Sequence, residues 1–192
     1  DAWLYNADYV SDTGYIKVKK IFSNFNSYKD YFKDLDNAIW HEVKDNIVRF
    51  KPDWVGYTSY TANISAIKII SDKVKKTDPS IKQVVGGVHA TLDSDILKTL
   101  TSIDYSIQRE GEEAFTALVE NKNPKFIPGV VSRDKGGILF KTGIAPVIKN
   151  IDTLPMPERE KFWNIPDSEK KNVDVSYVNT IRAVSYTHLT LP

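Results

Sequence analysis

One pattern occurs three times in this sequence: a short apolar strand stops at a glycine or a small hydroxyl residue, and a helical segment follows. Such repeated units favour a parallel sheet with helices on both faces, because the crossover between parallel strands is nearly always right-handed. In such a sheet ligands bind beyond the carboxyl ends of the strands. The three strand ends lie at 55–59, 84–91 and 109–113. We therefore expect the function of this chain to reside in these three loops.

Hydrophobic spacing predicts the elements between the loops. The expected strands are 3–5, 54–58, 81–85 and 103–108, and three of the expected helices are 37–50, 93–100 and one from 112 onward. A further helix is expected between Asn63, whose side chain can cap the first turn, and Asp78, where Pro79 stops it. The stretch 6–27 is polar and is expected to be irregular.

The character of the sequence changes after residue 120. Glycine and proline punctuate two short strands, 130–132 and 138–141, which predict a hairpin. Prolines then stiffen 151–157, which predicts an extended connector between domains. The expected organisation is an α/β domain over 1–120 whose first strand lies upstream, a hairpin and connector over 121–182, and a non-native tail over 183–192.

Composition excludes several classes of function. The 192 residues carry a formal net charge of +1, and the lysines are spread along helix faces, so no field favours nucleic acid or an acidic membrane. No apolar run approaches the length of a membrane span, and no signal peptide opens the chain. The sequence contains no cysteine, which excludes disulfides, thiolate metal sites and a cysteine nucleophile. We expect a cytoplasmic chain that binds neither nucleic acid nor membrane.

Four motifs follow one another in a set order. They are KPDWVGYT at 51–58, VGGVHAT at 85–91, REGE at 109–112 and LPMP at 154–157. Together they resemble the cobalamin-binding domain of cobalamin-dependent radical S-adenosylmethionine (SAM) enzymes, and the resemblance extends over 1–182. It implies a flavodoxin-like, Rossmann-like doubly wound parallel sheet. The cofactor is then a cobalamin, held against the carboxyl edge of this sheet with its nucleotide tail directed toward the core.

The resemblance also implies three groups of cofactor-binding residues, one after each strand. They are Thr58, Ser59 and Tyr60; Gly86, Gly87, Val88 and His89; and Arg109, Glu110 and Gly111. Physical chemistry agrees, since glycines allow the backbone to approach a bulky planar ligand and hydroxyls can hydrogen-bond its tail. The N-termini of the following helices favour anionic groups. The alternative is that the paired glycines only shape a tight turn.

Neither the histidines nor the acidic residues indicate a metal site. An imidazole binds cobalt readily, but the Asp-x-His-x-x-Gly loop that supplies it in many cobalamin modules does not occur in this sequence. We therefore expect His89 to border the ligand or to cap a helix. The acids at Glu110, Glu112 and Glu113 are better explained by the positive end of a helix than by catalysis. No catalytic residue is predicted.

The end of the chain bears on what the whole protein does. The stretch 175–182 resembles the strand before the three-cysteine loop that holds a four-iron, four-sulfur cluster in radical SAM enzymes, yet no cysteines follow. The tail at 183–192 resembles translated adapter sequence. We therefore expect a module that is not catalytic by itself and that works with a missing radical SAM domain, where a cluster and S-adenosylmethionine support methyl transfer or a radical rearrangement.

Two alternatives from other classes stay open. The first is a corrinoid-free relative, in which the domain serves as a structural or interaction module of a radical SAM protein. The second is another flavodoxin-like domain that binds a flavin or other nucleotide, which rests on analogy of fold alone.

Overall fold

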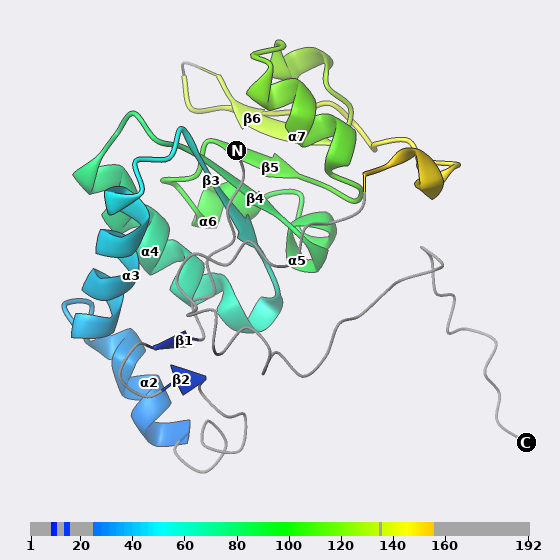
Figure 1. Cartoon of the computed structure of the whole chain (residues 1–192). Helices are drawn as coiled ribbons and strands as arrows, with labels where there is room; N and C mark the ends of the chain where they lie inside the picture. Colours follow the sequence, from blue (N-terminus) through cyan, green and yellow to red (C-terminus); the bar gives the residue numbers. More distant parts are fainter. Residues whose placement is uncertain (1–8, 11–13, 16–24, 135, 156–192) are drawn as a thin grey trace, which may run out of the picture. The chain divides into compact units, whose positions relative to one another are not determined.

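The computed structural model of the protein describes residues 9–10, 14–15, 25–134 and 136–155 (Figure 1). The expected strand at 3–5, the strand-like stretch at 175–182 and the tail at 183–192 lie outside these residues. The chain divides into two compact units, one of 1–17 with 156–192 and one of 18–155. The described part of the first unit is an antiparallel pair of strands, β1 (Tyr9–Val10) and β2 (Gly14–Tyr15).

The second unit is built on a five-stranded sheet in the order β3-β4-β5-β6-β7. Its strands are β3 (Trp54–Thr58), β4 (Lys82–Gly86), β5 (Tyr105–Ile107), β6 (Val130–Arg133) and β7 (Leu139–Lys141). Strands β3, β4 and β5 run parallel, as expected for strands joined by helices. Strands β6 and β7 form the predicted hairpin, and β6 pairs antiparallel with β5. The hairpin therefore continues the main sheet.

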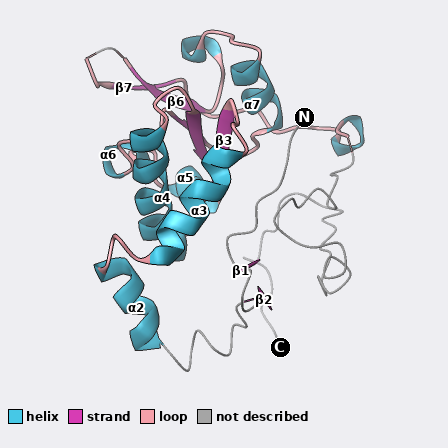
Figure 2. Cartoon of the chain, turned by 60° about the vertical axis from the view of Figure 1, so that its left-hand side comes forward, coloured by secondary structure: helices cyan, strands magenta, loops and turns pink. Residues whose placement is uncertain are grey.

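The helices that the structure describes are α2 (Phe25–Lys33), α3 (Ala38–Arg49), α4 (Ile64–Thr77), α5 (Val88–Leu92), α6 (Ile96–Thr99) and α7 (Glu112–Val119), with short 3-10 turns η1 (Thr61–Asn63), η2 (Pro124–Phe126) and η3 (Ile151–Thr153). Among the described residues, α4 connects β3 to β4, and α5 and α6 connect β4 to β5, while the other α-helices precede β3 or follow β5. Helix α3 lies alongside α4 (Figure 2). No helix among the described residues is long and apolar enough to cross a membrane.

Alternation along β4 creates two hydrophobic cores. Val85 faces a cluster that includes Ile67 of α4 and Leu97 of α6, whereas Val84 faces a cluster that includes Leu118 of α7. Neighbouring residues of a strand point to opposite faces, so β4 is covered on both sides. The prediction of an α/β sheet with helices on both faces is therefore confirmed for the part of the chain that the structure describes.

Three expectations about elements were wrong. The stretch 6–27 contains β1, β2 and the start of α2, because two-residue strands carry no detectable alternation. The helix expected over 93–100 is the shorter α6, and a second short helix, α5, precedes it and begins directly after Gly87. Asn63 stands at the N-cap of α4 without capping it, since its amide nitrogen donates to the Thr58 carbonyl and its oxygen accepts from Tyr60 N.

Candidate functional site

The three predicted loops meet at the carboxyl edge of the parallel strands. Ser59 N donates to Gly86 O at 2.7 Å, and His89 N donates to Ser59 O at 3.1 Å. The third loop joins through Arg109 N, which donates to the Thr91 hydroxyl at 2.8 Å. The structure therefore brings the loops after β3, β4 and β5 together, and we call them the rim: residues 58–61, 86–92 and 109–111.

The two glycines of the rim have different roles. Gly87 has a φ of +99°, and a Cβ there would lie 2.9 Å from both the nitrogen and the oxygen of Ser59. Only glycine fits this close backbone approach. A Cβ at Gly86 would meet nothing nearer than Ile107 O at 3.8 Å, an ordinary contact. The protein's own packing therefore explains Gly87, whereas it does not require a glycine at position 86.

Ser59 connects the first two loops from inside the protein. Its side chain is fully buried, its hydroxyl donates to Gly86 O at 2.7 Å and it accepts from Ala90 N at 3.0 Å. Both hydrogen-bonding functions are thus engaged within the chain. We expect Ser59 to position the rim and Thr58, which is exposed, to be the hydroxyl that faces a ligand.

Apolar side chains project from the rim into solvent. Tyr60 and Val88 are 56% and 58% exposed, and Leu92 is 78% exposed. Large apolar groups lose solvent contact when a corrin-sized planar ligand covers them, which favours binding. Sequence reasoning identified Tyr60 and Val88 but missed Leu92. Leu92 lies one helical turn after Val88, which would have indicated that both share one face of a helix. The expected helix began at residue 93, so this spacing was not considered.

His89 is paired within the rim. Its Nδ1 lies 3.0 Å from the Thr61 hydroxyl, which ties the second loop to η1. The sequence analysis did not include Thr61, because no local spacing relates it to a residue 28 positions away. In the part of the chain that the structure describes, no group of three or more His, Cys, Asp or Glu residues could hold a metal ion. The role of His89 at the ligand border stays a prediction.

The third loop is divided between the rim and the connector. Arg109 has a φ of +64° and an exposed side chain. The Glu110 carboxylate accepts from Ile148 N at 2.6 Å, so it faces the connector segment. Gly111 is the N-cap of α7, whose first turn carries Glu112 and Glu113. The negative charges of these two acids already compensate the positive end of α7. Helix α5 spans only five residues, so its dipole is small. The expected preference of these two helix N-termini for an anion therefore has little support.

A buried hydroxyl lies just below the rim. Ser106 of β5 is fully buried, and its Oγ finds no hydrogen-bond partner among the described residues. The register pairs Ser106 with Val85, the residue before Gly86. An unpaired buried hydroxyl is costly, but Ser106 shares the face of Val85 and not that of Gly86, because neighbouring residues of a strand point to opposite faces. The exposed apolar groups of the rim fit one face of a planar cofactor.

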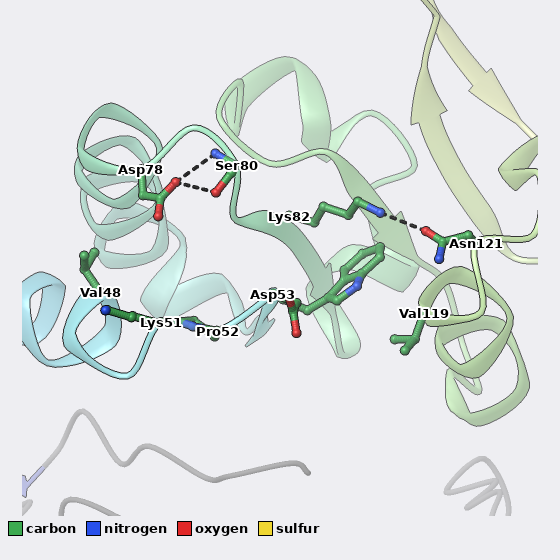
Figure 3. Close-up of a pocket in the computed structure, with 10 residues that line it drawn as sticks. Val48, Lys51, Pro52, Asp53, Asp78, Ser80, Lys82, Val119 and Asn121 are labelled. Carbon is green, nitrogen blue, oxygen red and sulfur yellow. Dashed lines mark hydrogen bonds between the residues drawn. The ribbon is translucent and has the colours of Figure 1, made fainter.

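A groove lies at the other end of the same strands (Figure 3). It is an open groove of about 700 Å³ at the amino ends of β3 and β4. Its lining includes Trp54, and Lys82 Nζ lies 5.0 Å from the Trp54 ring centroid and donates to Asn121 Oδ1 at 3.0 Å. Asp78 accepts from the nitrogen and the hydroxyl of Ser80. None of the predicted site residues lines this groove.

Comparison with known proteins identifies a domain family. Residues 5–119 match the B12 binding domain family. The anaerobic magnesium-protoporphyrin IX monomethyl ester cyclase of Rubrivivax gelatinosus is 26% identical over 199 residues, covering 97% of this chain and 33% of that protein. An uncharacterized methyltransferase of Pyrococcus horikoshii is 25% identical over 127 residues, covering 64% of this chain and 28% of that protein. The chain thus spans about a third of the length of the curated relatives it matches.

Two solved structures share this part of the fold at low identity. One is the cobalamin-dependent SAM radical enzyme OxsB with aqua-cobalamin and S-adenosylmethionine bound, with a TM-score of 0.45 and 17% identity over 56% of this chain and 16% of that chain. The other is the radical SAM methyltransferase TsrM from Kitasatospora setae with cobalamin and a [4Fe-4S] cluster bound, with a TM-score of 0.43 and 17% identity over 66% and 23%.

Proposed function

The chain belongs to the B12-binding domain family, and from that premise we propose that its rim holds the cobalamin of a radical SAM enzyme. The observation that carries the choice of site is the set of exposed apolar side chains that surrounds Gly86 at the carboxyl edge. A Cβ there would have no neighbour nearer than 3.8 Å, and the exposed side chains of Tyr60, Val88 and Leu92 come from the adjoining loops. A cobalamin placed there is in contact with backbone and apolar groups together.

The residues of the rim would bind and orient the cofactor. Tyr60, Val88 and Leu92 would cover an apolar part of the corrin and exclude water from it, and the exposed Thr58 hydroxyl would hydrogen-bond its polar substituents. When bound, cobalamin supplies methyl-transfer or electron-transfer chemistry, and the protein supplies position.

The whole protein would carry more than this domain. The chain covers 33% of a cyclase and 28% of an uncharacterized methyltransferase, so most of each relative lies beyond the matched region. We propose that the intact enzyme contains a radical SAM domain with an iron–sulfur cluster and S-adenosylmethionine, and that its reaction is methyl transfer or radical rearrangement. On this view the present chain is not catalytic by itself, and its cysteine-free sequence fits a cytoplasmic location.

The test is an absorbance titration of the 192-residue chain with hydroxocobalamin and with methylcobalamin. We expect saturable binding and a shift of the corrinoid spectrum. Gly86→Leu should abolish binding because the leucine side chain would occupy the position proposed for the cofactor. Gly56→Leu is the matched control, since Gly56 lies within β3 and its Cβ would also meet its nearest neighbour at 3.8 Å.

Circular dichroism melts would show that each variant is folded. Retained binding by a folded Gly86→Leu variant would contradict the assigned site. A folded wild-type chain that binds neither corrinoid would contradict the proposal itself and favour the corrinoid-free structural module.

A further inference from the structure

The segment that leads out of the hairpin returns to the carboxyl end of β5. Gly129 N donates to Gly143 O at 3.1 Å, and Ala145 is buried. A Cβ at Gly129, whose φ is +81°, would lie 2.8 Å from the Ala145 Cβ. The segment therefore packs closely on Gly129, and it leaves the sheet at the end where α5 also lies (Figure 1). We call residues 142–148 the strap.

One side chain fastens the far end of the strap. Glu110 Oε2 accepts from Ile148 N at 2.6 Å, across 38 positions of sequence. A carboxylate that accepts from a backbone amide makes one of the stronger hydrogen bonds in proteins. At the near end, the Thr142 hydroxyl donates to Ile127 O at 2.7 Å and accepts from Val130 N. The strap is thus held at both ends.

A continuous set of hydrogen bonds and adjacent residues links the strap to Gly87. The Thr91 hydroxyl donates to Gly87 O at 3.0 Å and accepts from Arg109 N at 2.8 Å. The next residue, Glu110, holds Ile148. A ligand that contacts the loop after β4 is therefore connected, through these bonds, to the loop that holds the strap.

We propose that Glu110 is a positioning residue that couples the strap to the cofactor rim, so that strap docking and cobalamin binding stabilise each other. The proposal rests on the proposed function for its ligand, whereas the strap contact exists without one. In this proposal the Glu110 carboxylate contacts the strap and does not contact the cofactor directly.

Hydrogen exchange measured on the full chain tests the contact. In the wild type without ligand, the Ile148 amide should be protected. Glu110→Ala should raise its exchange rate about tenfold, the effect expected from losing one hydrogen bond to a charged group. Glu110→Gln retains an acceptor and should restore part of the protection. Glu113→Ala is the matched control, because Glu113 is an exposed acid three residues further on.

A second variant reaches the strap by a different route. Gly129→Ala pushes the added methyl group against Ala145 and should also raise exchange over the strap. Unchanged exchange at Ile148 in folded Glu110→Ala would overturn the contact.

The coupling is tested by adding hydroxocobalamin. We expect extra protection of the strap from exchange in the wild type. In Glu110→Ala the Kd for cobalamin should rise about tenfold, whereas in Glu113→Ala it should equal the wild-type value. Wild-type binding without extra strap protection, and with no change of Kd in Glu110→Ala, would overturn the coupling alone. No binding by the folded wild type would overturn the proposed function and the coupling with it, while the exchange data without ligand would still report the contact.

Discussion

The two ends of the parallel strands differ in what holds them together. At the carboxyl end, backbone groups and one buried serine hydroxyl join the loops, glycines bring them close, and apolar side chains stay exposed. At the amino end, buried polar side chains form a satisfied network. The comparison teaches that the two ends of one sheet are built differently: the amino end carries a network of polar side chains, and the carboxyl end leaves apolar surface exposed where we propose that the ligand binds.

Gln83 is the centre of the amino-end network. This residue of β4 is fully buried, and its amide nitrogen donates to Ser71 O at 3.1 Å and to Ser102 O at 3.0 Å. Its oxygen accepts from the Tyr57 hydroxyl at 2.6 Å, and burial raises the pKa of that hydroxyl above its usual value. Beside it, Asp104 accepts from Gln83 N and from Lys75 Nζ.

The largest effect should come from removing the centre of this network. Gln83→Leu has a similar volume but removes the hydrogen bonds to the Tyr57 hydroxyl and to the Ser71 and Ser102 carbonyls, so we expect the free energy of unfolding to fall by about 3 kcal/mol. Urea denaturation measures it. Gln108→Leu is the control, because its amide makes one long bond of 3.4 Å. An equal loss of unfolding free energy in both variants would contradict the inference that the two ends of the sheet are stabilised differently.

The next effect should appear at the rim. Gly87→Ala places a Cβ 2.9 Å from Ser59 backbone atoms at a φ of +99°, so a loss of about 2 kcal/mol is expected. Gly86→Ala, whose Cβ has a 3.8 Å contact, should change stability little. Thermal melts of the two neighbouring variants measure the difference. Equal melting temperatures of Gly87→Ala and Gly86→Ala would contradict the close approach of Gly87 to the Ser59 backbone.

A smaller effect should separate binding from stability. Leu92 is 78% exposed, so Leu92→Asp should leave the melting temperature nearly unchanged. If cobalamin covers this side chain, its affinity should fall about tenfold, since burying a leucine contributes roughly 1.5–3 kcal/mol. Titration and a melt of the same sample provide both readouts. A lower melting temperature without a loss of cobalamin affinity would show that Leu92 contributes to the stability of the fold and not to binding.

The smallest effect concerns an exposed ion pair on the hairpin side. Hydrogen bonds from Lys141 and Lys98 hold the pKa of Asp95 below its ordinary value. A lowered native pKa means that this stability is present above the unfolded pKa, about 3.9, and is lost as pH falls through the native value. Asp95→Asn should therefore lower the melting temperature slightly at neutral pH and have no effect in strong acid. A difference that persists in acid would exclude the charge as its cause.

Local sequence predicted much of the framework. The strand at 54–58, the end of α4 at Asp78 and the hairpin all follow from apolar runs and from proline or glycine stops. These signals are local, because backbone conformation depends on neighbouring residues. The position of the rim followed from the same reasoning, since the carboxyl ends of parallel strands share one edge.

The orientation of side chains could not be predicted in the same way. Whether the Ser59 hydroxyl faces a ligand or Ala90 N depends on a contact across 31 positions. The Glu110 contact with Ile148 also has no local signal, and the family resemblance had implied a ligand contact at this position. Leu92 was missed because α5 spans five residues, too few for a periodic pattern.

The buried Ser59 hydroxyl has a consequence for the time course of binding. Because it bonds Gly86 O and Ala90 N, the first two loops are joined before any ligand arrives. A loop that must order itself after encounter adds a slow first-order phase, and a pre-organised one does not. Stopped-flow mixing of the chain with hydroxocobalamin should therefore show a single phase whose rate rises linearly with corrinoid concentration.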